Sequence, residues 1–260
     1  TGIEFSINSV NINKEDFSWT SYLSLAYNKN TITQLNSPIA ISTGEQLISK
    51  EYVTDYPAFT IFAYDFAGLD GIGDPQIRLH DNTVIKDPLY VTKTDDIRFM
   101  GTYQPVWSGG LSNAFRYKDF TLSANTALNF GHVMRLDGAT GFPHPNFLKR
   151  WRQPGDEAFT DIPSYEANTA ASGARRNIGY YSAGHTNVVS ASYIKLRDIT
   201  LSYNLPKSIV QQIRTENISL RAQVSNIMLW KANSQGIDPE FGYSTPFGQR
   251  TVTLGANVRF

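Results

Sequence analysis

The sequence predicts an all-β protein, an antiparallel transmembrane β-barrel segment of about seven strands with long extracellular loops. Three observations lead to this fold class. Several segments alternate apolar and polar residues with a period of two, as strands with one apolar and one wet face do. The chain of 260 residues holds 14 Tyr, 15 Phe and 4 Trp, side chains that fit pleated, half-buried surfaces. Finally, short and long connections between these segments alternate along the chain, which is the layout of outer-membrane barrels.

The alternation predicts seven spanning strands. They are residues 2–13, 17–29, 110–118, 120–131, 193–204, 217–230 and 250–260. The last is the most regular, with Val252, Leu254, Ala256, Val258 and Phe260 on one face. In 3–12 and 193–203 the apolar set changes parity, which predicts a β-bulge or a strand that continues beyond the lipid.

Two kinds of connection join these strands. Residues 13–16 and 118–119 predict tight turns, whereas 30–109, 132–191 and 231–249 predict long outer loops. With the final residue at the periplasmic rim, all strand directions are consistent. Two smaller features are expected within the connections. Residues 58–66 form a β segment in an outer loop, and residues 207–213 form a helical turn.

Seven strands cannot close a bacterial barrel, where strand numbers are even. Unpaired backbone N–H and C=O groups are costly in lipid, so both edges of the sheet need partners. The simplest partner is the remainder of the same polypeptide. We therefore expect residues 1–260 to form one portion of a larger barrel.

Composition excludes several classes of protein. Lys plus Arg and Asp plus Glu each number 23, and this zero net charge argues against a nucleic-acid partner. The absence of cysteine excludes a disulfide-stapled scaffold and Cys-ligated metals. The sequence contains no run of about 18 apolar residues, so it predicts no transmembrane helix. Barrel strands are not detected by this criterion.

Aromatic residues supply the candidate sites. One set lies near strand ends, where amphipathic rings prefer the depth of lipid headgroups and form a membrane girdle. It comprises Phe17, Trp19, Tyr27, Phe120, Phe130, Tyr203 and Phe260. A second set lies in loops and could stack against substrate, or could instead pack the loops together or against a lid protein. It comprises Trp107, Trp151, Tyr180, Tyr181, Phe241 and Tyr243.

No residue pattern predicts catalysis, a metal or a cofactor. The four histidines are isolated from one another in the sequence, without the spacing of a zinc site. The SxxK pattern Ser192–Lys195 lies within a predicted strand rather than at a helix start, so chance explains it better. Five cations in one long loop, Lys149, Arg150, Arg152, Arg175 and Arg176, could face lipopolysaccharide or a partner, and a solvated face is the default.

The chain resembles the SusC/RagA family of TonB-dependent outer-membrane transporters of Bacteroidetes. The resemblance is carried by residues 191–206 (ASYIKLRDITLSYNLP), by 224–230 (VSNIMLW), by Gly236–Glu240 (GIDPE) and by the final strand with its terminal aromatic residue. Earlier motifs follow in the same order. They are FSW at 17–19, NKN at 28–30, GLD at 68–70, GG at 109–110 and YKDF at 117–120.

The resemblance implies a barrel of about 22 strands with a plugged lumen, of which this chain forms the C-terminal portion without the plug domain or TonB box. It implies active import of oligosaccharides or peptides, with a SusD-like surface lipoprotein as lid and energy from the TonB complex. It also implies an integral protein of the bacterial outer membrane, in contact with lipid, that is not an enzyme. Two alternatives remain open: a passive porin, and a soluble carbohydrate-binding β-sandwich.

Overall fold

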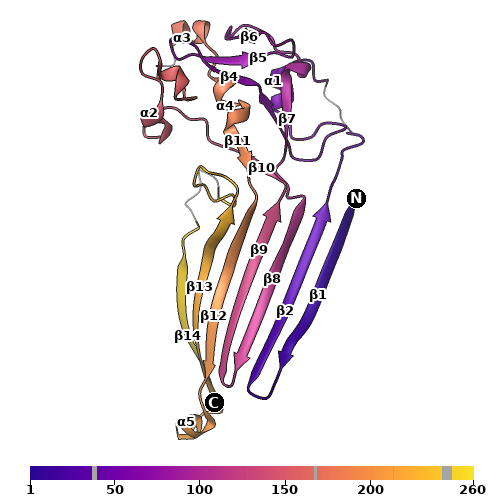
Figure 1. Ribbon diagram of the computed structural model, residues 1–260, viewed down its shortest axis with the longest axis vertical. Helices are drawn as coiled ribbons and strands as arrows, with labels where there is room; N and C mark the ends of the chain where they lie inside the picture. Colours follow the sequence, from indigo (N-terminus) through magenta and orange to yellow (C-terminus); the bar gives the residue numbers. More distant parts are fainter. Residues whose placement is uncertain (37–39, 167–168, 213, 242–247) are drawn as a thin grey trace. The chain divides into compact units, whose positions relative to one another are not determined.

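The computed structural model describes residues 1–36, 40–166, 169–212, 214–241 and 248–260. The chain divides into two compact units (Figure 1). Unit 1 comprises Thr1–Lys29, Pro105–His132 and Ala191–Phe260, and unit 2 comprises Asn30–Gln104 and Val133–Ser190. Each unit therefore combines segments that are distant in the sequence.

Unit 1 is a seven-stranded antiparallel sheet of order β1-β2-β8-β9-β12-β13-β14. The strands are β1 (Gly2–Asn13), β2 (Phe17–Asn28), β8 (Trp107–Tyr117), β9 (Phe120–Phe130), β12 (Tyr193–Asn204), β13 (Asn217–Lys231) and β14 (Thr251–Arg259). A short helix, α5 (Lys207–Gln212), connects β12 to β13. The predicted all-β sheet and its seven strands are confirmed to within three residues at each boundary.

The largest boundary difference is at β8, which begins at Trp107 rather than at residue 110. The sequence placed Gly109 at the end of a long loop and Gly110 at the start of the strand, whereas both lie inside the strand. A Cβ atom on Gly109 would lie 2.2 Å from the carbonyl oxygen of Ser24. The glycine therefore allows β2 and β8 to approach closely, which is a recognised use of glycine in strands.

Both predicted changes of parity coincide with irregular pairing. The register of β1 against β2 shifts between Val10 and Ile12. That of β12 shifts between Leu196 and Asp198 against β9, and between Ile194 and Lys195 against β13. The first of the two explanations, a β-bulge, accounts for Ile12 in β1 and for Ile199, Leu201 and Tyr203 in β12. Val10 precedes the bulge of β1 and pairs with Thr20 on the polar face.

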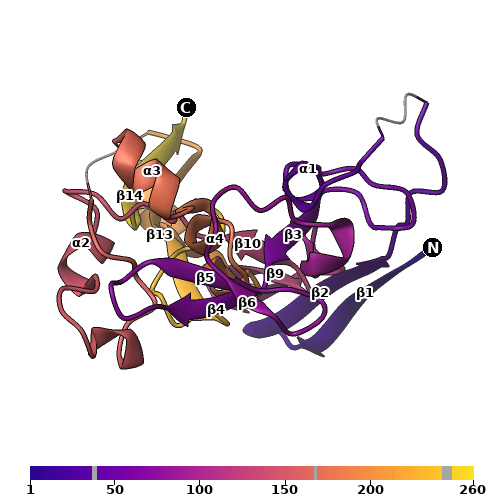
Figure 2. The ribbon, with the colours of Figure 1, turned by 90° about the horizontal axis from the view of Figure 1, so that it is seen from above.

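Unit 2 is built from small sheets and short helices. It has paired strands β3 (Thr60–Tyr64) and β7 (Ile97–Thr102), and β10 (Val133–Arg135) and β11 (Val188–Ser190). A third sheet contains β4 (Phe66–Leu69), β5 (Pro75–Arg78) and β6 (Val84–Ile85), side by side in Figure 2. The helices are α1 (Gly44–Ile48), α2 (Asn146–Lys149), α3 (Ala170–Arg175) and α4 (Gly179–Ser182), with 3₁₀ turns η1 (Thr94–Asp96), η2 (Asp156–Ala158) and η3 (His185–Asn187).

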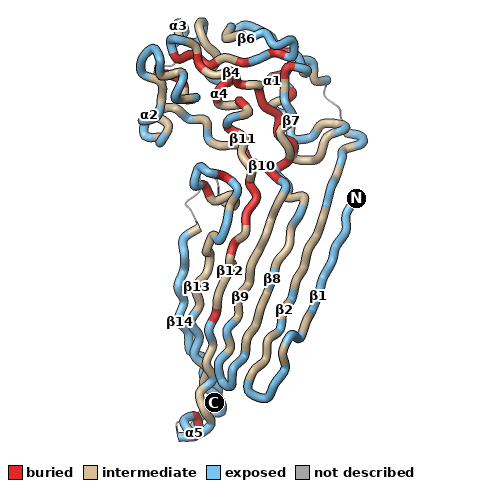
Figure 3. Tube along the Cα trace, in the orientation of Figure 1, coloured by how far each residue is buried: buried red, intermediate tan, exposed pale blue. Residues whose placement is uncertain are grey.

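The hydrophobic core lies mostly in unit 2, as the buried segments of Figure 3 show. One cluster comprises Tyr64, Ile77, Leu79 and Tyr180, and a second comprises Phe66, Leu69 and Tyr181. The β segment expected at 58–66 corresponds to β3 and the start of β4. The sequence predicted long loops here but did not predict that they form a folded unit with its own core.

Candidate functional site

One face of the unit 1 sheet is apolar across all seven strands. Residues directly opposite in antiparallel strands share a face. One row, Phe5, Leu25, Gly109 and Leu128, runs across β1, β2, β8 and β9. A second row, Leu122, Leu201, Ala222 and Leu254, runs across β9, β12, β13 and β14. Many of these side chains are exposed, among them Phe5 (52%), Leu201 (46%) and Leu254 (79%). A water-soluble sheet would cover such a surface, whereas lipid covers it in a membrane.

Aromatic rings gather at both ends of this apolar face. We call the end with the turns at 14–16 and 118–119 the turn end, and the opposite one the loop end. At the turn end Trp19 stacks on Phe115 (ring centroids 5.6 Å apart) and Phe120 on Tyr203 (4.3 Å). At the loop end Tyr27 contacts Trp107 (4.8 Å) and Phe130 contacts Trp230 (6.0 Å). Two aromatic bands fit the two interfaces of a bilayer.

The predicted girdle residues occupy these bands or the strand ends beside them. Phe17 and Tyr117 pair at the turn end, and Phe260 follows the end of β14 with 86% exposure. The role of all seven as a membrane girdle remains a prediction. The structure adds Trp107, Phe115 and Trp230 to the candidate bands. Pairing register, which the sequence does not state, brings them beside the predicted residues.

The opposite face of the sheet is polar and would line a lumen. In β9 it presents Thr121, Ser123 and Asn125, and in β13 it presents Ser219, Arg221 and Gln223. Asn125 donates to both carboxylate oxygens of Asp198 (3.0 and 3.2 Å) at the bulge of β12. These hydrogen bonds link polar side chains of the neighbouring strands β9 and β12.

A polar cluster interrupts the apolar face near the turn end. Asn11, at the bulge of β1, donates to Ser21 (2.7 Å), which in turn donates to Asn113 (2.7 Å). The Asn113 side-chain oxygen also accepts from Trp19 Nε1 (3.0 Å). These mutual bonds satisfy polar groups that lipid could not satisfy. Sequence reasoning missed this cluster because its members come from three strands, β1, β2 and β8, whose register the sequence does not state.

A second cluster lies on the polar face at the loop end. Lys195, with 1% of its side chain exposed, donates to Asp238 (2.9 Å) and Glu240 (2.7 Å). Glu240 also accepts from Arg197 (2.5 and 2.9 Å) and from Tyr193 Oη (2.6 Å). The Lys195 amine lies 4.8 Å from the centre of the Phe241 ring. These contacts attach the loop that follows β13 to the sheet, and they engage the lysine of the SxxK pattern.

The charge of Glu240 depends on this cluster. Burial raises its pKa, but hydrogen bonds from Lys195, Tyr193 and Arg197 outweigh burial and lower the pKa to about 2. Glu240 is therefore ionised at neutral pH.

The predicted substrate-contacting aromatics occupy other environments. Trp107 lies in β8 on the apolar face, not in a loop, because that strand starts earlier than predicted. Tyr180 and Tyr181 are 1% and 4% exposed within the two cores of unit 2. Trp151 packs on the second core and donates to Glu157 (2.9 Å). Burial of these three residues favours the packing role that the sequence left open.

The remaining two predicted contacts lie in the loop after β13. Phe241 is partly buried over Lys195. Tyr243 lies outside the described residues. Contact between any of these aromatic residues and a substrate remains a prediction.

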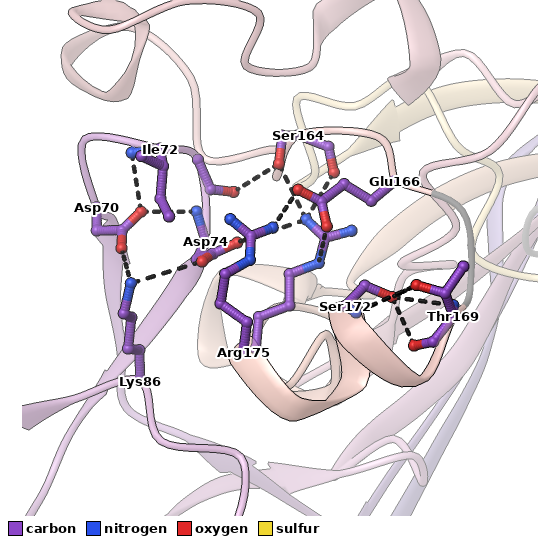
Figure 4. A network of polar contacts seen from close by, with 11 residues as sticks. Asp70, Ile72, Asp74, Lys86, Ser164, Glu166, Thr169, Ser172 and Arg175 are labelled. Atoms are coloured by element: carbon purple, nitrogen blue, oxygen red, sulfur yellow. Dashed lines mark hydrogen bonds and ion pairs between the residues drawn. The ribbon is translucent and has the colours of Figure 1, made fainter.

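Unit 2 contains a third polar cluster, centred on Asp74 (Figure 4). The Asp74 carboxylate has no exposure and accepts no hydrogen bond, but Arg175, Lys86 and Arg176 lie 3.3, 3.6 and 3.7 Å away. Arg175 also pairs with Glu166. Burial raises the pKa of Asp74 while the cations oppose the rise, and Asp70 nearby adds to it. The cluster joins the β4–β5 hairpin to α3, so Arg175 and Arg176 have structural partners.

Within the described ranges, no group of three His, Asp or Glu side chains is arranged to hold a metal ion. In the same part of the chain, no helix is long and apolar enough to cross a membrane. His185 Nδ1 accepts from the backbone N–H of Phe66 (3.1 Å), and His80 contacts Asp96 (2.8 Å), so both have local partners.

The sequence and the fold of the chain are similar to those of known proteins. No protein-family model matches the chain. The chain is 27% identical over 321 residues to TonB-dependent receptor P39 of Formosa agariphila, and 28% identical over 308 residues to receptor P26 of the same organism. Both matches cover 100% of this chain. Over its whole length the chain is therefore similar to TonB-dependent receptors, as the resemblance in its sequence predicted.

Solved structures show the same fold. The match to a structure of the RagAB peptide transporter covers 100% of this chain and 29% of the transporter chain, with a TM-score of 0.71 and 19% sequence identity. The RagAB peptide importer in its "open-open" state gives a TM-score of 0.69 at 18% identity. The chain therefore shares the β-barrel fold of these structures, as predicted. The prediction of a non-enzymatic protein of Bacteroidetes agrees with these relatives.

The chain spans about 30% of the length of the curated relatives that it matches, 30% of P39 and 29% of P26. The activity, substrates and partners of the whole protein therefore go beyond what these comparisons show.

Proposed function

We propose that this chain forms seven strands and two long outer segments of a transporter that actively imports nutrients across the outer membrane. The observation that carries the proposal is the apolar face of unit 1, which spans all seven strands between two aromatic bands and lies opposite a polar face. An importer needs such a wall, with one face toward lipid and one toward an aqueous path. The match of the whole of this chain to TonB-dependent receptors supports active rather than passive transport.

The architecture of the whole protein follows from the sheet edges. Among the strands that the structure describes, β1 and β14 are the edges of the sheet and pair with β2 and β13. We place the missing partner strands in the rest of the same polypeptide, with this chain as the C-terminal portion of the barrel. A plug domain and a TonB box would lie on other segments.

The transported substrate is an oligosaccharide or a peptide. Similarity to solved structures of a peptide transporter supports the peptide class, and the resemblance to SusC supports the oligosaccharide class. A SusD-like surface lipoprotein would act as lid, and the TonB complex of the inner membrane would supply energy. Both partners are proposals.

Uptake by intact cells tests this function. A strain lacking the full-length gene and its complemented counterpart are compared for uptake of labelled oligosaccharides and peptides. We expect uptake only with the gene, and its loss when a protonophore removes the proton gradient that TonB uses. Uptake that continues without the gradient would favour the passive porin.

Extraction of the full-length protein tests the remaining alternative. An integral barrel enters solution only with detergent, and the denatured polypeptide has a mass several times that of this chain. A soluble carbohydrate-binding β-sandwich would stay monodisperse without detergent, because its apolar faces would meet each other in a core.

A further inference from the structure

Unit 2 contains a hollow of about 480 Å³ between α2 and η2. Three of its lining residues are cationic and one is an exposed aromatic. The lining residues are Lys149, Arg150, Arg152, Gln153, Asp156, Phe159 and Thr160. Its volume suits a small ligand or one unit of a larger one.

The carboxylates near this hollow are already used by backbone and indole N–H groups. Asp156 accepts from the backbone N–H of Arg152 (2.9 Å) and of Gln153 (3.2 Å). Glu157 accepts from Trp151 Nε1 (2.9 Å) and from the backbone N–H of Gly155 (2.8 Å). In the described part of the chain, Lys149, Arg150 and Arg152 make no ion pair. The hollow is therefore positively charged inside a chain whose net charge is zero.

The two guanidinium groups are held in place. Arg150 lies 3.9 Å from the centre of the Phe147 ring and donates to the Phe147 carbonyl. Arg152 donates to the carbonyl of Leu148 (2.8 Å). Trp151, between them in sequence, is anchored in the second core and donates its backbone N–H to Ile162 (2.9 Å). Each guanidinium keeps further N–H donors for a ligand, because it has five in all.

This arrangement separates the five cations that the sequence placed together. Arg175 and Arg176 face Asp74 and Glu166 and serve the fold. Lys149, Arg150 and Arg152 have no such acidic partner, which makes them available to an anion from outside the chain.

We propose that this hollow binds an anionic sugar. A carboxylate, sulfate or phosphate group on the sugar would accept hydrogen bonds from the guanidinium groups and the Lys149 amine. The ring of Phe159, which is 90% exposed, offers an apolar surface for the C–H face of the sugar ring. An acidic peptide satisfies the cations but brings no sugar face to this ring. The proposal rests on the proposed function, because it requires unit 2 to be extracellular.

An anionic sugar could come from two sources, a soluble acidic oligosaccharide or the phosphorylated sugars of lipopolysaccharide. Calorimetric titration of the full-length protein in detergent tests both, with oligogalacturonate and with lipopolysaccharide micelles as separate probes. A neutral oligosaccharide and a glutamate peptide of equal charge serve as comparisons. Binding of oligogalacturonate identifies a substrate subsite, and binding of lipopolysaccharide alone identifies a membrane contact.

Variants locate the binding. We expect the K149Q/R152Q variant to lose at least about tenfold in affinity, since each charge-assisted bond lost costs that order. The matched control K14Q/K207Q also removes two exposed cations, but at the turn end, and should change affinity less than about twofold. F159A should weaken binding of the sugar while leaving the response to inorganic sulfate unchanged.

Equal binding of the neutral oligosaccharide, preference for the glutamate peptide, or an equal loss in the control would overturn the inference. The uptake assay keeps this result apart from the proposed function. Energised uptake without anionic-sugar binding contradicts the inference alone. Binding without any uptake contradicts the proposed function and leaves the hollow as a sugar site.

Discussion

At the residue scale, Asp74 combines complete burial with cations that approach without forming hydrogen bonds. Burial raises its pKa, so the fold favours the neutral form of this side chain. The cations make the charged form tolerable. Removing the charge and removing a cation should therefore have unequal effects.

We expect Asp74→Asn to change local stability by less than about 1 kcal/mol, and Arg175→Met to cost about 2–3 kcal/mol by leaving a buried carboxylate short of a partner. The double variant should recover most of that loss, because the carboxylate is gone. Hydrogen exchange of the β4–β5 amides in the full-length protein measures these effects. A loss for Asp74→Asn as large as that for Arg175→Met would contradict this account.

The pKa of Glu240 is lowered, whereas that of Asp74 is raised, and the lowered pKa gives a prediction about pH. Its pKa is lowered from 4.5 to about 2, so its contribution is complete above pH 4.5 and is lost as the pH falls toward 2. We expect pepsin to cleave near Phe241 at pH 2 but not at pH 4. In Glu240→Gln, cleavage should already occur at pH 4.

The control is Glu216→Gln, which makes the same substitution in an exposed pair with Arg259. It should leave the onset of cleavage at its original pH. Equal shifts in both variants would show that Glu240 does not anchor the loop.

At the scale of elements, two glycines in the sheet differ in their surroundings. A Cβ on Gly109 would collide with the Ser24 backbone, whereas nothing lies within 4 Å of a Cβ on Gly255. We expect Gly109→Ala to destabilise the barrel by about 1–3 kcal/mol, as overpacking does. Gly255→Ala should be nearly neutral. Urea titrations of folding into phospholipid vesicles compare the two, and equal effects would contradict close approach of β2 and β8.

The strands could be predicted from sequence because each one carries its own evidence. In β14 and β2, the alternation of apolar and polar residues alone predicts which face of the strand each residue occupies. A change in the parity of the apolar residues predicts a bulge even when the partner strand is unknown. The start of β8 could not be predicted, since the use of Gly109 depends on the neighbouring strand. The contact between Tyr27 and Trp107 could not be predicted either, because it depends on the register of β2 against β8.

At the scale of the whole molecule, the two faces of the sheet should differ in their tolerance of charge. Leu111 lies at mid-strand on the apolar face, and Ser112 follows it on the polar face. We expect Leu111→Arg to cost about 2–4 kcal/mol, as arginine does at the middle of a bilayer. Ser112→Arg should cost much less.

Heat-dependent unfolding of the full-length barrel on semi-native gels checks this pair of substitutions. If both arginines are tolerated equally, or if Ser112→Arg is the more damaging, the assignment of lipid and lumen faces is reversed or wrong.

Unit 2 was the part that sequence could not resolve. Its core unites Tyr64 and Phe66 from one long connection with Tyr180 and Tyr181 from the other. No local pattern encodes a contact between segments more than 100 residues apart. The sequence therefore left open whether Tyr180 and Tyr181 contact substrate or pack the loops, and the structure places both in the core. The five cations that the sequence placed in one basic loop divide into two groups.

The shared core of unit 2 also has a consequence for assembly of the barrel. β2 and β9 run in the same direction, so the two segments of unit 2 depart from the same end of the sheet. Residues 30–104 cannot complete their core until residues 133–190 have been synthesised and delivered to the same side of the membrane. A hairpin inserted upside down would separate the two halves across the bilayer. We therefore expect the core of unit 2 to form only when both hairpins are correctly inserted, and a mis-inserted chain to leave Tyr64, Phe66, Tyr180 and Tyr181 exposed.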